Sequence, residues 1–328
     1  MHLEFATKLR CPRTHSRLEL RDIVTEHDRI RSGRLCCPDC GDDYEIRDFI
    51  PRFVPASNYA DSFGMQWNMF RMTQLDSTSG HPISATRFWK ATNWSPNALK
   101  GHWVLDVGCG AGRFAEVALS AGAHVVALDY SSAIDACYAN LRHHENFHAI
   151  QADIYQLPFL PQSFPFVYSL GVLQHTPDVA RAFAALPPIV QPGGSLCVDV
   201  YARSWKTAIR PYYWLRPITK RMSKARLFSI LRRAVPAILP MSRVLGRVPR
   251  VGVRLRRLMP VANYEGMLPL THMQHLEWSL LDTFDFLAPE YDNPQTSDAV
   301  RRWFEHANMT NVEVLTADHL VGRGHAPA

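Results

Sequence analysis

Long apolar runs are missing from this sequence. No stretch approaches the roughly 20 apolar residues that a membrane-spanning helix needs, and no secretory signal peptide is recognisable. Acidic residues are missing from 200–264, a segment that carries sixteen Lys or Arg residues. The rest of the chain therefore has a net charge of −10, because the whole chain totals +6. We expect a globular protein whose positive charge is concentrated in one region.

Cysteine is scarce, and its distribution is uneven. The chain has seven cysteines, an odd number that does not suit a complete disulfide framework. Four of them lie near the N-terminus, where Cys37 and Cys40 have the Cys-x-x-Cys spacing of a zinc knuckle. Such thiols suit a reducing compartment, so we expect a cytoplasmic protein. With 328 residues, the chain has room for one large domain and a small module.

A glycine-rich turn organises the centre of the chain. Residues 103–107 are mainly apolar and predict a buried strand, and apolar residues at helical spacing follow from Phe114. Gly108, Gly110 and Gly112 lie between them. A strand, a glycine turn and a helix begin a doubly wound α/β sheet, whose ligands bind beyond the carboxyl ends of the strands. Glycine lets a ligand approach the backbone because it has no Cβ atom.

The glycine spacing and the preceding acid narrow the choice of ligand. A dinucleotide-binding loop has the spacing G-x-G-x-x-G, whereas this loop is G-x-G-x-G. Asp106 precedes the first glycine, where it would repel a pyrophosphate but would suit a cation. Residues 104–114 resemble motif I of class I S-adenosylmethionine (SAM) methyltransferases. The resemblance implies an α/β fold with a Rossmann-like seven-stranded sheet and a SAM site that includes Asp106 and the three glycines. A nicotinamide-binding Rossmann unit is the alternative.

Two further acids follow expected strands. Asp129 ends a strand over 124–128, where an acid hydrogen-bonds the ribose in nucleotide-binding folds. Asp153 and Ile154 resemble the adenine-binding position of the same methyltransferases. We add Tyr130 and Leu170 as cofactor contacts. Acids at three successive strand ends, together with the glycine loop, predict SAM binding.

The segment after the fourth expected strand supplies a candidate base. Residues 171–178 resemble motif IV of the ubiquinone-biosynthesis-type methyltransferases. His175 lies within it and could act as a general base near pH 7, or it could simply pack the loop. We assign 103–202 to the SAM-binding core and 296–328 to a helix and strands that complete the core.

Residues 56–102 predict lid or linker helices before the first core strand. The segment is rich in aromatic residues and amphipathic. Many methyltransferases of this class carry helices here that fold over the cofactor. The resemblance therefore implies lid contacts from Gln66, Trp67, Gln74 and Asp76.

Residues 1–55 predict a small zinc-ribbon-like module. The segment 44–53 resembles the zinc-ribbon activator subunit of tRNA and release-factor methyltransferases. Thr14 stands where that family has a second cysteine. A ribbon without metal is the alternative. The expected ligands of a structural Zn²⁺ ion are Cys11, His15, Cys37 and Cys40.

Residues 203–295 predict a basic helical insertion, or substrate cap, after strand five. Its prolines predict several short helices. Insertions at this position commonly build the acceptor pocket in this fold class. His272 and His275 are further candidates for catalytic residues. Possible acceptor contacts are Tyr264, Glu265 and Asp282.

The charge of this insertion suggests an anionic partner for 203–257. An anionic membrane surface, RNA and a phosphate-bearing small substrate are candidates, and a solvated basic cap is the alternative. We expect a cytoplasmic enzyme, peripheral at the inner membrane face, that methylates oxygen or nitrogen of a small-molecule, glycan or lipid-linked acceptor. An RNA methyltransferase and a non-catalytic SAM-binding scaffold are the alternative functions.

Overall fold

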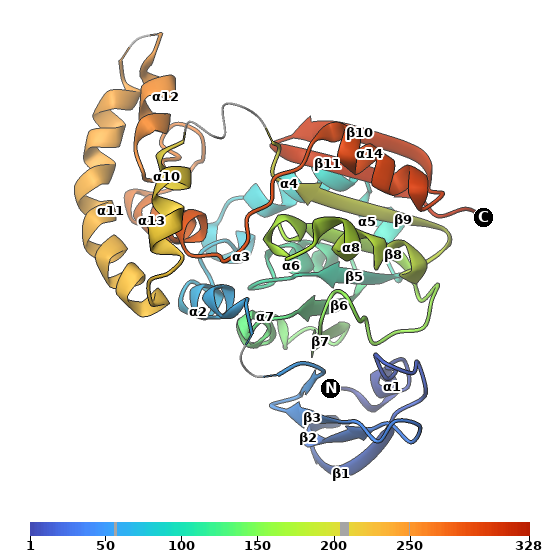
Figure 1. Ribbon diagram of the computed structural model, residues 1–328. Helices are drawn as coiled ribbons and strands as arrows, with labels where there is room; N and C mark the ends of the chain where they lie inside the picture. The colour runs from blue at the N-terminus through green and yellow to red at the C-terminus, as the bar shows by residue number, and fades with distance from the viewer. Residues whose placement is uncertain (56–57, 204–209, 249) are drawn as a thin grey trace.

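One mixed β-sheet organises the computed structural model, which describes residues 1–55, 58–203, 210–248 and 250–328 (Figure 1). Seven of its strands form the predicted Rossmann-like core, and the predicted α/β fold is confirmed. In spatial order these are β7 (Phe147–Gln151), β6 (His124–Asp129), β5 (Trp103–Val107), β8 (Phe164–Leu170), β9 (Val190–Val200), β11 (His319–His325) and β10 (Thr310–Ala317).

The strand order reverses at β5. This strand pairs in parallel with β6 on one side and with β8 on the other, and β9 continues the parallel part of the sheet. β11 then runs antiparallel to β9 and forms a hairpin with β10, which closes the sheet. Ligands of open α/β sheets bind beyond the carboxyl end of the strand where the order reverses, so the topology places the site after β5.

Hydrophobic residues on both faces of the core strands bury the sheet between helices. Val104 belongs to a cluster with α4 (Ile83–Thr92), α6 (Arg113–Ser120) and α7 (Ala133–Leu141). The next residue, Leu105, belongs to the cluster on the opposite face, with α8 (Val179–Ala184) and α14 (Ser297–His306). Side chains of a strand alternate between faces, so a continuous apolar run serves both cores. Short elements complete the chain: α1 (Leu3–Ala6), α3 (Asp76–Ser79), α5 (Pro96–Leu99), α12 (Gly252–Leu255), and the 3-10 turns η1 (Leu173–His175), η2 (Pro187–Ile189) and η3 (Arg256–Leu258).

The N-terminal module extends the core sheet, whereas the sequence predicts a separate small unit. Its antiparallel strands are β1 (Glu19–Glu26), β2 (Arg29–Cys36), β3 (Asp43–Arg47) and β4 (Ile50–Arg52). β4 lies parallel to β7, so the sheet has eleven strands in the described part of the chain. Arg52 fixes this junction, because its guanidinium donates to Gln151 at 2.7 Å and to Asp135 at 2.6 Å. The module thereby covers the edge of β7, which would otherwise expose unpaired backbone groups.

The cap is a helical layer beside the carboxyl ends of the strands (Figure 1). It comprises α10 (Pro211–Thr219), α11 (Lys224–Gly246), α12 and α13 (His272–Leu287), and its predicted range includes residues 204–209 and 249, which lie outside the described residues. α2 (Asp61–Met69) forms the lid next to it. None of the helices in the described ranges combines the length and the apolar character needed to cross a bilayer.

The prediction that prolines divide the cap into short helices is wrong for α11. This helix runs through Pro236 and Pro240 for 23 residues. Each interior proline costs about 3 kcal/mol, but buried side chains recur every fourth residue and pack against the α13 side of the cap. Fully burying one aliphatic side chain contributes about 1.5–3 kcal/mol, so the stripe outweighs the lost backbone hydrogen bonds. The stripe consists of Leu227, Leu231, Val235 and Leu239.

Neighbouring residues of α11 provide a test of this packing. Leu231 is 7% exposed, whereas Ile230 is 46% exposed. We expect Leu231→Ala to lower the free energy of unfolding by about 2–5 kcal/mol, and Ile230→Ala to change it by less than about 0.5 kcal/mol. Urea unfolding followed by circular dichroism measures both. Equal effects of the two substitutions would contradict the assigned orientation of the helix.

Candidate active site

A cavity of about 920 Å³ lies at the carboxyl ends of the core strands. Its walls come from the glycine turn after β5, the ends of β6 and β8, the lid helix α2, and the cap helices α10 and α13. Small-molecule sites commonly enclose about 300–1,000 Å³, so the cavity has room for a cofactor and a second ligand together. Its sheet side and its cap side differ in their residues and are described in turn.

The glycine turn forms the floor of the sheet side. Gly108 and Gly110 line the cavity with φ values of 82° and 55°, a region that side-chain-bearing residues rarely adopt. A Cβ atom at Gly108 would lie 2.4 Å from Val172, and one at Gly110 would lie 3.1 Å from Trp67 of the lid. The backbone conformation and the close neighbours both favour glycine at these two positions.

Gly112 has a packing role, unlike the other two glycines. It precedes α6 with a φ of 92° and does not contribute to the cavity wall. A Cβ atom there would lie 2.8 Å from Cys137 and 2.7 Å from Leu141 of α7. This glycine allows close helix packing, and direct cofactor contact at this residue stays a prediction.

Asp129 lies at the end of β6 and holds the turn in place. One carboxylate oxygen accepts from the backbone N–H of Gly110 at 2.9 Å, and the other accepts from the N–H and hydroxyl of Ser131 at 2.8 and 2.7 Å. Burial raises the pKa of Asp129, and these hydrogen bonds oppose that rise. Asp129 and Tyr130 both line the cavity, as do Ile154 and Leu170.

The two other predicted acids lie outside the cavity wall. Asp106 is 2% exposed beneath the turn, and one of its buried oxygens has no hydrogen-bond partner in the described part of the chain. Burial raises the pKa of Asp106 to about 8. Asp153 accepts from the N–H of Tyr155 at 2.9 Å, while its neighbour Ile154 faces the cavity. Direct cofactor contact by Asp106 and Asp153 therefore stays a prediction, since neither side chain lines the cavity wall and each lies next to a residue that does.

His175 lines the cavity between the sheet and the lid. Its Nδ1 lies 3.1 Å from the carbonyl oxygen of Tyr291, which can only accept a hydrogen bond. Nδ1 therefore carries the proton in the neutral ring, and Nε2 holds the free lone pair. The imidazole packs against the rings of Phe63 at 5.0 Å and Tyr201 at 5.5 Å. This arrangement fixes the ring in one tautomer with its basic nitrogen available.

His272 and His275 do not line the cavity, and a catalytic role for them stays a prediction. His275 receives a hydrogen bond at Nε2 from the N–H of Tyr264 at 2.9 Å, and its Nδ1 lies 3.2 Å from Arg243. His272 is exposed and lies 3.1 Å from the same arginine. Glu265 pairs with Arg243 at 3.0 Å and is likewise outside the cavity wall. His272 and His275 of α13 and Glu265 of the preceding segment all contact Arg243, so they join this part of the cap to α11.

Two acids of α13 face the cavity and join the cap to the lid. Asp282 and Asp285 are three residues apart and therefore share one helix face. Asp282 accepts from Gln74 at 3.3 Å and from the hydroxyl of Tyr264, and Asp285 accepts from Gln66 at 3.3 Å. The lid candidates Gln66, Gln74 and Trp67 all line the cavity.

Asp76 has a different position from the other predicted lid residues. Its carboxylate accepts from the backbone N–H groups of Ser84 and Ala85, both at 2.8 Å, and it is not part of the cavity wall. The expected lid contact is corrected to stabilisation of the first turn of α4, where unpaired N–H groups attract an anion.

Sequence reasoning missed a charged group at the far end of the cavity. Arg87 of α4 pairs with the fully buried Asp199 of β9 at 2.7 Å, and it lies 3.0 Å from His319 of β11. Burial alone would raise the pKa of Asp199, but Arg87 and His319 outweigh it and hold the pKa below its usual value. The one available signal was an acid inside the apolar run 195–200, since a buried acid needs a partner.

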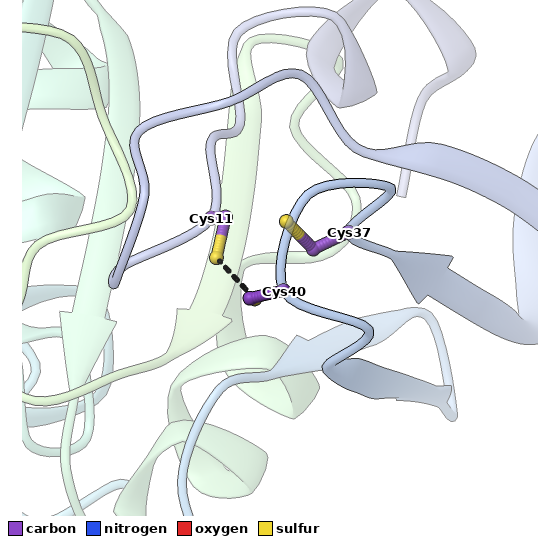
Figure 2. Close-up of side chains that lie close together, drawn as sticks. All are labelled: Cys11, Cys37 and Cys40. Atoms are coloured by element: carbon purple, nitrogen blue, oxygen red, sulfur yellow. Dashed lines mark hydrogen bonds between the residues drawn. The ribbon is translucent and has the colours of Figure 1, made fainter.

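The cysteines of the N-terminal module lie together at the tips of its hairpins (Figure 2). The sulfur atoms of Cys11, Cys37 and Cys40 all lie within 4.8 Å of one another, and those of Cys11 and Cys40 are 3.6 Å apart. The hydroxyl of Thr14 is 3.3 Å from the sulfur of Cys37. His15 is exposed, has a φ of 58° and does not belong to this cluster, so its assignment as a ligand is corrected.

The residues on the sheet side of the cavity lie in a segment that matches a known protein family. Residues 105–198 match the family described as a methyltransferase domain. The chain carries a class I methyltransferase domain. The ubiquinone biosynthesis O-methyltransferase of Aromatoleum aromaticum is 32% identical over 112 residues, 33% of this chain and 47% of the relative. Phosphoethanolamine N-methyltransferase 2 of Caenorhabditis elegans is 32% identical over 166 residues, 49% of this chain and 36% of the relative.

The likeness to these relatives is confined to part of each protein. The chain spans less than half the length of either one. Among solved structures, a SAM-dependent methyltransferase from Methanosarcina mazei is 15% identical, with a TM-score of 0.41 over 70% of this chain and 93% of that chain. A score this low establishes nothing by itself, and the strand order is what identifies the fold. The methyltransferase domain thus includes the glycine turn and Asp129, whereas the cap lies outside the matched residues.

The half-buried Asp282 should make stability depend on pH. Burial raises the pKa of this carboxyl to about 7 in the folded protein, from an ordinary value of 3.8. The folded state therefore binds the proton more tightly, so the resulting stabilisation is present below about pH 4 and is lost as the pH rises through about 7. We expect Asp282→Asn to reduce the fall in melting temperature between about pH 5 and about pH 8.

Thermal unfolding at both pH values measures this effect. Asp298→Asn, at an exposed aspartate of α14, is the matched control and should keep the wild-type pH dependence. An unchanged fall in melting temperature for Asp282→Asn would show that this carboxyl is ionised throughout that range.

Proposed function

We propose that this protein is a SAM-dependent methyltransferase that acts on a small molecule bound between the sheet, the lid and the cap. The observation that carries the proposal is one continuous cavity, which joins the glycine turn and Asp129 to His175 and the acids of α13. A cofactor held on the sheet side would face a second ligand on the cap side. The matched methyltransferase domain supports the cofactor part of the proposal.

The residues on the sheet side suit SAM, which supplies an electrophilic methyl group on a sulfonium when bound. Asp129 uses three hydrogen bonds, and a carboxylate can accept about four, so it retains capacity for a ribose hydroxyl. Gly108 and Gly110 leave room for close approach to the backbone. The buried Asp106 has an oxygen without a hydrogen-bond partner in the described part of the chain, which a donor group of the cofactor would satisfy. Ile154 and Leu170 offer apolar contacts to a base.

The cap side suits deprotonation of a bound hydroxyl or amine. Nε2 of His175 holds the lone pair that can receive the proton. Asp285 lies on the facing helix, where its carboxylate accepts from Tyr201 at 3.3 Å, the same tyrosine whose ring contacts His175. Most of the remaining rate enhancement should come from holding the cofactor and the acceptor in a reactive geometry.

The cavity wall favours an acceptor with an apolar or aromatic part. Several aromatic side chains of the cap line it, and such walls orient planar or lipid-like groups. The names of the relatives include an oxygen acceptor and a nitrogen acceptor, which agrees with a nucleophile of either kind. We therefore propose a small-molecule or lipid-linked acceptor. The aromatic wall is formed by Tyr201, Tyr212, Tyr213, Tyr264, Trp278 and Phe286.

Calorimetry with SAM tests the cofactor assignment. We expect Asp129→Ala to abolish measurable binding, because the substitution removes both the ribose acceptor and the bond that holds Gly110. Asp298→Ala, far from the cavity on the surface of α14, is the control and should bind as the wild type does. Circular dichroism checks that both variants are folded. Binding of SAM by a folded Asp129→Ala protein with wild-type affinity would contradict the assigned site.

We further propose that Cys11, Cys37 and Cys40 hold a structural zinc ion. Structural zinc is commonly bound by thiolates in a tetrahedral arrangement. The sulfur atoms of these three cysteines already lie close enough together to bind one ion. Burial works against the thiolate of Cys11, but hydrogen bonds with Thr14 and Tyr44 outweigh it and lower its pKa. The hydroxyl of Thr14 lies 3.3 Å from the sulfur of Cys37, so this hydroxyl or a water would complete the set.

Metal analysis of the purified protein tests the zinc proposal. We expect about one zinc ion per chain in the wild type and nearly none in Cys37→Ser, because three ligands are the minimum for a tight site. Cys36→Ser is the matched control, since its thiol is adjacent in sequence but outside the cluster. His15→Ala should also retain the metal. A metal-free wild type, prepared without chelator, would refute the proposal.

A further inference from the structure

The outer surface of the cap combines positive charge with exposed aliphatic side chains. We define the outer cap surface as the exposed residues of α10 and α11. Three large apolar residues of α10 are exposed: Trp214 at 65%, Leu215 at 38% and Ile218 at 67% exposure. On α11, Met241 and Val244 are 60% and 64% exposed. Single exposed apolar residues are ordinary, but a cluster on adjacent helices marks an interaction surface.

Arginines interleave with these apolar residues along α11. The inward stripe of this helix repeats every fourth residue, which leaves Arg226 and Arg233 on the opposite face with Ile230. These three residues border one shallow surface depression. Arg226, Arg232 and Arg233 form no ion pair within the described ranges of the chain, whereas Glu265 neutralises the more inward Arg243. The surface therefore keeps its positive charge.

The mixture of residues distinguishes between anionic partners. An RNA backbone would pair with the arginines but would gain nothing from Ile218, Met241 and Val244. The boundary between lipid headgroups and acyl chains accepts both kinds of side chain, and a tryptophan such as Trp214 prefers that boundary. The absence of every acid from 200–264 adds charge complementarity to an anionic bilayer.

The position of the helices allows contact with a flat surface. α11 is the outermost element of the cap, away from the sheet and from the N-terminal module (Figure 1). α10 has its other side at the cavity, where Tyr212 and Tyr213 line the wall. A bilayer against α10 would therefore lie next to the acceptor side of the cavity.

We propose that the outer cap surface docks on an anionic lipid bilayer, with α10 and α11 lying in the plane of the headgroups. The arginines of α11 contact lipid phosphates, and Trp214, Ile218 and Val244 enter the boundary with the acyl chains. This inference goes beyond methyl transfer and does not depend on it, because it concerns binding alone.

Sedimentation of the full chain with vesicles tests the proposal. The probes are phosphatidylcholine vesicles with and without phosphatidylglycerol, at physiological salt. We expect binding to the anionic vesicles only. The double substitution Arg226→Glu with Arg233→Glu should weaken it roughly tenfold or more, and Ile218→Ser with Val244→Ser should weaken it as well.

Matched surface pairs outside the cap serve as controls. Arg301→Glu with Arg302→Glu changes two exposed arginines of α14, and Ile23→Ser with Val24→Ser changes two exposed residues of β1. Both controls should bind as the wild type does. SAM calorimetry on the same samples reports the cofactor site separately, so failure of one proposal is distinguishable from failure of the other.

Three results would overturn the docking proposal. The first is a wild type that does not sediment with anionic vesicles. The second is an equal loss of binding in the α14 control and in the α11 variant, which would indicate an effect of net charge alone. The third is retention on bulk RNA that depends on Arg226 and Arg233 but not on Ile218 and Val244, without vesicle binding, which would assign the surface to nucleic acid.

Discussion

The carboxylate of Asp129 connects the elements on which the site depends. It accepts from Gly110 in the turn after β5 and from Ser131 at the start of α7. β5 and β6 are neighbours in the sheet, so a single side chain at the end of one fixes the turn at the end of the other. Glycine adopts many backbone conformations, including the positive φ values of this turn, so the hydrogen bond from Gly110 helps to select one of them. The position of Trp67 over Gly110 then follows from the position of the turn.

A second set of hydrogen bonds connects the lid to the cap, and it places two acidic side chains in a poorly solvated part of the cavity. Gln66 and Gln74 donate to Asp285 and Asp282 of α13, and Tyr264 donates to Asp282 as well. Burial raises the pKa of both acids, because removal of a carboxylate from water disfavours its charged form. Polar networks in a poorly solvated site are stable only when their members are paired. The lid and the cap consequently form one structural unit around the acceptor side, and movement of α2 would break these hydrogen bonds.

Sequence reasoning succeeded where the determining contacts are local. The glycine turn, the acid after β6 and the strands that close the sheet all follow from patterns within a few residues. It failed where a residue's role depends on distant elements. The burial of Asp106 within the sheet and the contact of His275 with Arg243 of α11 are features that no local pattern indicates. The continuity of α11 through its prolines depends on the apolar stripe that α13 covers, and the pairing of Arg87 with Asp199 joins segments 112 residues apart.

The two sides of the cavity therefore differ in what determines them. Successive turns after β5, β6 and β7 build the sheet side, and each turn carries its own recognisable residues. The cap side combines single residues from α2, β9, α10 and α13, which meet only because an insertion folds back over the sheet. Substitutions in the insertion can change the acceptor wall without altering the turn or Asp129. The methyltransferase match ends at residue 198, before this insertion begins. Sequence motifs therefore indicate the cofactor, whereas the acceptor has to be inferred from the residues that line the folded cavity.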